Sequence, residues 1–448
     1  MKSFVGTFVC GAFLCFSHAL SVWAQNSPGP PILTVDQAVQ IALAGNRDLK
    51  IAELTVESSK WQVASTKTNR LPAISTYILG TGFLTSPSFL FKKGSLGKVG
   101  GLPVPENDSR IPLSSGMTGY ALAQALQPLS QLYKISLSIY EQELATQNDN
   151  EQLRSQRQNV VANVKQDYYS LLQTQSSIDD TNAYIKQYEE TDRVTDEYLA
   201  QEAVLKSDSL TVKAQLAQYR YQLLELNNTL QTQKEQLNDL LGRDLDTDFR
   251  TEAVPPMSFE ELDLKFAQQR ALVQRAEIRE AEIGVKKADT DRKLAKAQYI
   301  PDISASIHYF TPINTELLPT NIATAGVEMS WEPWDWGRRR DDLKQKVIGL
   351  SQAQYQLAKT RSQVLLDVNN NFRKLSQSRQ MLSVTQAAKD AANEKLRETN
   401  DKFSKEAVLL RDVLQQQTAV ANANKDYENA LLSFWTARAN FEKALGQE

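Results

Sequence analysis

The chain has 448 residues, a formal net charge of −3 and only two cysteines, Cys10 and Cys15. The nearly balanced charge provides no electrostatic basis for binding nucleic acid. Because both cysteines lie near the start, the rest of the chain has neither a disulfide framework nor a cysteine metal site.

Residues 1–24 predict a signal peptide. Lys2 gives a positive start, an apolar run extends from Phe4 to about Leu20, and residues 22–24 (Val-Trp-Ala) form a small-x-small pattern. The alternative is a membrane anchor, but the run is short for a span of about 20 apolar residues. We therefore expect export, with cleavage after Ala24.

The remainder predicts a duplication, with one copy over residues 25–256 and another over residues 257–448. An offset of 229 joins residues 71–74 (Leu-Pro-Ala-Ile) to residues 300–303 (Ile-Pro-Asp-Ile), and an offset of about 204 joins residues 202–205 to residues 406–409. The first copy therefore carries about 24 extra residues, in a stretch at 83–112 that is rich in Gly, Pro and Ser. Such composition predicts a loop, and Pro255-Pro256 marks the join between the copies.

The first copy begins with a predicted helix over residues 35–68, which leads into strands over residues 73–80 and 119–127. A long helix follows over residues 133–192. From Leu205 onward, apolar residues recur at alternating spacings of four and three, the seam of a coiled coil. The seam contains Leu205, Ser209, Val212, Leu216, Tyr219, Leu223, Leu226, Leu230, Gln233, Leu237 and Leu240.

The second copy repeats this order, with a helix over residues 260–298, two strands, and a long helix over residues 338–400. In its strands, Ile303, Ala305, Ile307 and Tyr309 alternate with polar residues, as do Ala325, Val327, Met329 and Trp331. Such alternation also fits an ordinary soluble hairpin. Predicted export and the aromatic residues at the strand's end favour strands in a membrane. These interface aromatics are Trp331, Trp334 and Trp336.

Four short motifs, taken together, resemble the TolC-like outer-membrane efflux protein family. They are residues 33–38 (Leu-Thr-Val-Asp-Gln-Ala), residues 295–302, which lead a helix into a strand, residues 331–340 with their Pro, Trp, Asp, Gly and Arg, and residues 444–446 (Ala-Leu-Gly). The resemblance covers nearly all of the chain after the predicted signal peptide. It implies a mainly α fold with a small transmembrane β part, assembled as a homotrimer whose α-barrel joins a 12-stranded β-barrel.

The four predicted strands of one chain cannot close a barrel, and an open edge is not tolerated in lipid. The chain must therefore assemble with other copies. Since about eight strands suffice for a small barrel, two copies would also close one. The number three comes from the resemblance.

The resemblance also implies functional residues. The turns that join the long helices would dock an adaptor (membrane-fusion) protein, through Glu202, Ala203, Val204, Leu205, Glu406, Ala407, Val408 and Leu409. The channel gate would lie at Asp412 and Gln415. The family has a second acidic residue where this chain has Gln415, and glycines at turns where it has Gln201-Glu202 and Lys405-Glu406.

The sequence contains no motif that predicts an enzyme. His308 is the only histidine after residue 24, and a lone histidine is more often structural than a metal ligand. The glycines around Lys98 lack the spacing of a phosphate-binding loop, and no nucleophile elbow is found. We therefore expect no catalysis, no cofactor and no metal site.

The predicted function is an outer-membrane channel subunit of a tripartite efflux or type I secretion system. It would form a passive export duct, with an adaptor protein and an inner-membrane pump or transporter as partners. The alternative is a periplasmic coiled-coil scaffold or adaptor without a pore. Adaptors usually contain a glycine-rich β-domain between their helices, and none is found here.

Overall fold

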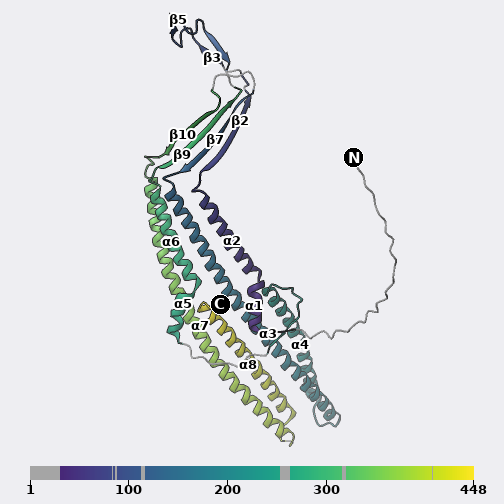
Figure 1. Ribbon diagram of the computed structural model, residues 1–448. Coiled ribbons are helices and arrows are strands. Elements are labelled where there is room, and N and C mark those ends of the chain that lie inside the picture. The colour runs from purple at the N-terminus through teal and green to yellow at the C-terminus, as the bar shows by residue number, and fades with distance from the viewer. Residues whose placement is uncertain are drawn as a thin grey trace, which may run out of the picture.

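The computed structural model describes residues 31–82, 84–85, 88–112, 117–252, 263–314, 319–405 and 407–447. The predicted signal peptide, the Pro255-Pro256 join and Glu406 lie outside these residues. The chain is long and mainly helical, with a small sheet at one end (Figure 1). The mainly α fold with a small β part is thus confirmed.

The same order of elements occurs twice. The first set contains α1 (Val35–Gly45), α2 (Arg47–Thr68), β2 (Ala73–Gly82), β7 (Met117–Pro128), α3 (Leu132–Ala200) and α4 (Lys206–Leu240). The second set contains α5 (Leu264–Gln274), α6 (Ala276–Ala297), β9 (Asp302–Ile313), β10 (Ile322–Ser330), α7 (Arg338–Phe403) and α8 (Leu410–Ala444). Both offsets found in the sequence recur here, since α1 and α2 precede α5 and α6 by 229 residues, and α4 precedes α8 by 204.

Each predicted N-terminal helix is broken into two, so the prediction of one continuous helix at 35–68 and one at 260–298 was wrong. Asn46 and Arg275, at the two breaks, have extended backbone. The Asn46 side chain accepts a hydrogen bond from the Leu49 N–H at 3.0 Å and so caps α2. Asparagine is favoured at this position because its oxygen satisfies a free backbone donor.

The two breaks are held by equivalent contacts. Asn46 Nδ2 donates to the Leu240 carbonyl at 2.8 Å. Arg275 Nη1 donates at 3.3 Å to the carbonyl of Ala444, which lies 204 residues after Leu240. Gly242 and Gly446 follow these carbonyls, both with positive φ. A Cβ on Gly242 would lie 1.9 Å from the Gly45 carbonyl oxygen, so this joint requires glycine.

The segment at 83–112 is not simply a loop, as the sequence predicted. It contains two short antiparallel pairs, β3 (Ser88–Phe91) with β6 (Ser109–Pro112), and β4 (Lys98–Val99) with β5 (Leu102–Pro103). Phe89 and Ile111 pair across the first of these. Phenylalanine and isoleucine favour strands. The ribbon that these pairs form projects beyond the main sheet (Figure 1).

The main sheet is antiparallel, in the order β10-β9-β7-β2. The predicted turn near Pro312 begins slightly later, because β9 continues to Ile313. Parallel pairing of β1 (Ile32–Leu33) with β8 (Arg250–Thr251) forms a separate two-stranded sheet beside the helices.

The upper helices follow the sheet in the same lateral order. Contacts join α2 to α3, α3 to α6, and α6 to α7. Consequently β2 and α2 lie at one edge of the molecule, and β10 and α7 lie at the other. Within the described part of the chain, neither β2 nor β10 has a partner on its outer side.

The long helices pair as two antiparallel hairpins, α3 with α4 and α7 with α8. The predicted seam of α4 is confirmed except at its first position, since Ser209, Val212, Leu216, Tyr219 and Leu237 are buried but Leu205 is exposed. The largest core lies at mid-height, where α1 and α5 meet the long helices; it includes Phe249, Trp435 and Phe441. No helix in the described residues is both long and apolar enough to cross a membrane.

Candidate functional site

The tip of the first hairpin, at the end remote from the sheet, is a tight turn between α3 and α4. The Ala203 N–H donates to the Tyr198 carbonyl at 2.9 Å. Glu202 has a φ of 56°, so a side chain occupies the left-handed position that usually favours glycine. Leu205 is exposed and Val204 is half-buried. Three of the four predicted docking residues therefore lie on the surface.

The tip of the second hairpin has the same construction. The Ala407 N–H donates to the Lys402 carbonyl at 2.9 Å, which is the equivalent bond 204 residues later. Ala407 and Leu409 are exposed and Val408 is half-buried. The structure thus brings the predicted docking residues that it describes to two similar tips at one end of the molecule (Figure 1).

Asp412 and Gln415 lie in the first two turns of α8, next to the second tip. Asp412 Oδ2 accepts a hydrogen bond from the Leu409 N–H at 3.1 Å, whereas Gln415 is exposed. A carboxylate in the first turn also interacts favourably with the helix dipole. Asp412 therefore has a structural role within one chain, beside any role that it has in a gate.

The predicted interface aromatics lie where β10 leaves the sheet. Trp331, Trp334 and Trp336 are exposed, and Trp336 reaches 88%. Trp334 and Trp336 pack edge to face, with ring centroids 5.9 Å apart. The Asp335 carboxylate orders the turn into α7, since it accepts from the N–H groups of Gly337 and Arg339, both at 3.1 Å.

One face of the sheet is apolar, as the alternation in the second copy predicted, whereas the opposite face combines polar residues on β9 and β10 with the packed rings of Tyr77, Tyr120 and Phe310. The register places Ile74 beside Ala125, Ala125 beside Ile307, and Ile307 beside Ala325. On the other face, His308 Nε2 lies 2.6 Å from Glu328 Oε1. The apolar face is exposed at Ile74, Ile78, Ile307, Val327 and Met329.

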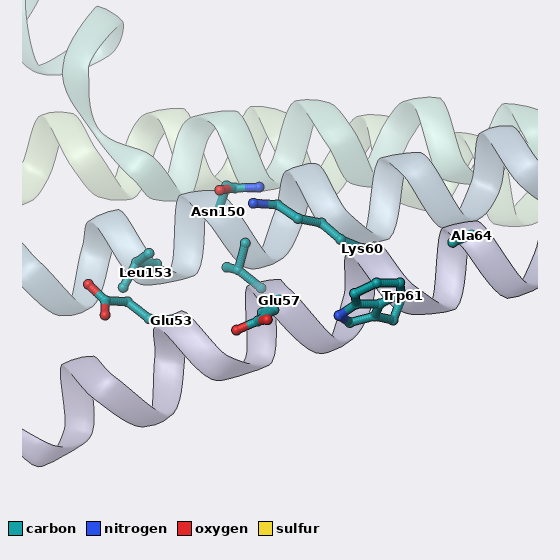
Figure 2. A pocket seen from close by; sticks show the side chains of 8 residues that line it. Glu53, Glu57, Lys60, Trp61, Ala64, Asn150 and Leu153 are labelled. Carbon is teal, nitrogen blue, oxygen red and sulfur yellow. The ribbon is translucent and has the colours of Figure 1, made fainter.

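The outer edge of α2 carries exposed apolar residues that the sequence analysis did not single out. Trp61 projects from α2 beside a groove between α2 and α3, and Lys60 points toward Asn150 on α3 (Figure 2). Ile51 and Leu54 are exposed on the same helix. Val347, Ile348 and Tyr355 are exposed on α7, at the opposite edge of the molecule.

A ladder of polar contacts, also missed from the sequence, joins the two hairpins along α3 and α8. Its members are Lys165 with Glu442 at 2.5 Å, Gln166 with Asn440 at 2.9 Å, Gln173 with Asn429 at 2.7 Å, Ser176 and Ser177 with Glu428 at 3.0 Å, and Tyr184 with Asn424 at 2.7 Å. No periodicity in one helix reveals such pairs, because each joins positions more than 200 residues apart.

Across the described ranges, no group of three or more His, Cys, Asp or Glu side chains is arranged to bind a metal ion.

Comparison with known proteins connects this architecture to a family. Residues 267–447 match the family model described as outer membrane efflux protein. A search of curated proteins gives no match to the chain. The second copy therefore matches the outer membrane efflux protein family, and the resemblance given by the sequence motifs is confirmed over this part of the chain.

Solved structures of outer-membrane channels share the fold over most of their length. The outer-membrane channel OprN aligns with a TM-score of 0.76 at 16% identity, over 92% of this chain and 90% of that one. CusC aligns with a TM-score of 0.77 at 16% identity, over 92% of both chains. The Campylobacter jejuni outer membrane channel CmeC gives 0.75 at 16% identity, over 92% and 85%.

Proposed function

We propose that the chain is the outer-membrane channel subunit of a tripartite efflux system. The sheet spans the outer membrane and the helices extend into the periplasm. The observation that carries this proposal is the four-stranded sheet with two unpaired edges and an exposed apolar face, which continues into a helical layer with the same lateral order. Lipid would cover the apolar face, and further copies of the chain would pair the edges.

The duplication indicates how the copies meet. Leu54 and Trp61 on α2 are 54% and 70% exposed, whereas their equivalents on α6, Ile283 and Thr290, are 8% and 1% exposed. Helix α6 has neighbours on both sides, α3 and α7, whereas α2 contacts α3 but not α7. Within one chain, α2 therefore lacks a contact with α7. By the repeat, that contact would be equivalent to the one between α6 and α3.

The other edge shows the complementary difference. Ile348 on α7 is 60% exposed, whereas its equivalent on α3, Leu144, is 1% exposed. Helix α3 lies between α2 and α6, but α7 meets only α6 in this layer. In the assembly, α7 of one copy packs against α2 of the next, as α3 packs against α6 within a chain. Such head-to-tail contacts close into a ring, and three copies give the 12-stranded barrel that the family implies.

We further propose that transport through this ring is passive. An inner-membrane pump or transporter supplies the energy, and a periplasmic adaptor connects it to the two tips of each chain. Asp412 and Gln415 lie at the narrow end of the helical barrel, where three Asp412 carboxylates form a ring that attracts cations. The three tryptophans lie at the periplasmic surface of the membrane, where amphipathic rings are favoured.

Reconstitution in a planar bilayer tests the channel. We expect discrete ionic conductance from the purified oligomer; a folded oligomer without conductance would contradict the proposal.

The rival function, a scaffold without a pore, predicts a protein that carbonate or urea washes from membranes, whereas an integral barrel resists both. A deletion strain, scored for drug sensitivity and for a missing secreted protein, would distinguish efflux from type I secretion.

A further inference from the structure

One member of the ladder between the hairpins differs from the others in its chemistry. The Glu428 carboxylate on α8 accepts hydrogen bonds from the Ser176 and Ser177 hydroxyls on α3, both at 3.0 Å. The Asp180 carboxyl, one helical turn beyond Ser176 on α3, lines the same cavity as Glu428 and interacts with it. Two carboxyl groups can share a hydrogen bond only when one of them is protonated. The interaction between Asp180 and Glu428 therefore depends on a proton, unlike the other contacts of the ladder.

The surroundings favour the protonated form. Burial raises the pKa of Glu428 to about 7, and the nearby Asp180 raises this pKa further than burial alone would. Both residues line a polar cavity between α3, α4 and α8. The other titratable groups on its walls are Tyr184 from α3, Tyr219 and Glu225 from α4, and Lys425 from α8. Burial raises the pKa of Tyr184 to about 12, so this phenol stays neutral near pH 7.

We propose that the Asp180–Glu428 pair is a proton-controlled latch that holds the two helical hairpins together. When the pair holds a proton, one carboxyl donates to the other and α3 stays joined to α8. When both groups ionise, two negative charges face each other in a partly buried site, and the contact weakens. The latch itself concerns contacts within one chain. Its effect on transport rests on the proposed channel, because separation of the hairpins would widen the periplasmic end of that channel.

The direction of the pH dependence follows from linkage. The pKa of Glu428 is higher with the hairpins packed than its ordinary value of 4.5. The packed state therefore binds the proton more tightly, and its stabilisation is complete below the ordinary value and lost as pH rises toward about 7. Between these limits, the equilibrium between packed and separated hairpins shifts by at most about tenfold per pH unit in each chain.

The test measures the distance between the hairpins directly. Because Cys10 and Cys15 are the only cysteines and lie within the predicted signal peptide, Ala183→Cys on α3 and Asn422→Cys on α8 can carry a pair of spin labels. Both positions are exposed. Distances would be measured by electron spin resonance on the full oligomer in detergent, at about pH 5 and about pH 8. We expect a population of longer distances to grow at the higher pH.

Matched variants identify the responsible group. Glu428→Gln keeps the hydrogen-bonding shape without the titrating group and should abolish the pH response. Asp180→Asn removes the second charge and should reduce the response without abolishing it, because burial alone still raises the pKa of Glu428. Glu225→Gln removes a carboxylate from the same cavity outside the pair and should leave the response intact. An unchanged distance in the unsubstituted pair would overturn the latch, as would an equal response in Glu428→Gln. These measurements need no conductance, so they stand apart from the bilayer test of the channel.

Discussion

Asp412 illustrates how one side chain can serve both a single chain and an assembly. Its carboxylate caps the start of α8 through the Leu409 N–H. The same charge would contribute to a ring at the narrow end of the channel. The two roles separate experimentally, because an amide can replace the carboxylate as a hydrogen-bond acceptor but carries no charge.

We expect Asp412→Asn to keep the cap, to cost only the interaction with the helix dipole, about 0.3–1 kcal/mol, and to reduce the preference of the channel for cations. Asp412→Ala should reduce that preference equally and also destabilise the second tip by about 0.5–2 kcal/mol, since it removes the cap. Thermal unfolding and reversal potentials in a salt gradient measure the two effects. If Asp412→Asn leaves cation selectivity unchanged, Asp412 acts only as a cap.

At the scale of elements, the joints at Asn46 and Arg275 show the most specific backbone geometry. Gly242 has a φ of 73° and lies against the Gly45 backbone. We expect Gly242→Ala to destabilise the chain by about 2 kcal/mol or more, from left-handed backbone strain and from the clash with the Gly45 carbonyl. Gly284, which is helical and has open space around its Cβ position, is the matched control, and Gly284→Ala should be neutral or stabilising. Equal unfolding midpoints for the two variants would contradict this account.

The hairpin tips are the elements expected to contact the adaptor. Replacing Leu205 and Leu409, both exposed, with Glu should weaken adaptor binding at least tenfold, because it removes apolar contact and adds unpaired charge. Co-purification from crosslinked cells or titration with purified adaptor would measure this. Leu210→Glu, exposed on α4 one turn beyond the tip, is the control. Undiminished binding by the double variant would place the docking surface elsewhere.

Elements with a strong local pattern could be predicted from the sequence, and those fixed by distant contacts could not. The α4 seam appeared directly because its spacing reflects packing against one neighbour. The helix breaks at Asn46 and Arg275 were not predicted, because their side chains bond to the carbonyls of Leu240 and Ala444, far along the chain. The tips were located by the repeat, whereas the pairing of Glu428 with α3 required the arrangement in space.

For the whole molecule, the repeat makes the ring contact testable. Leu54→Arg on α2 or Ile348→Arg on α7 would bury an unpaired charge between copies, a cost of several kcal/mol. We expect either variant to yield monomers in size-exclusion chromatography with light scattering. Leu96→Arg, at a comparably exposed position in the ribbon formed by β3 to β6, should remain oligomeric. Intact oligomers from both edge variants would show that other surfaces form the ring.

The equivalent bonds at Ala203 and Ala407 have a consequence for stoichiometry. A ring of three chains would present six tips to the periplasm, alternating between two similar but unequal kinds. For a partner that recognises the shape of one tip, the trimer would therefore offer six similar binding sites with approximate sixfold symmetry. Two adaptor molecules could then bind each chain, and the differences between the tips would decide which of the two binds first.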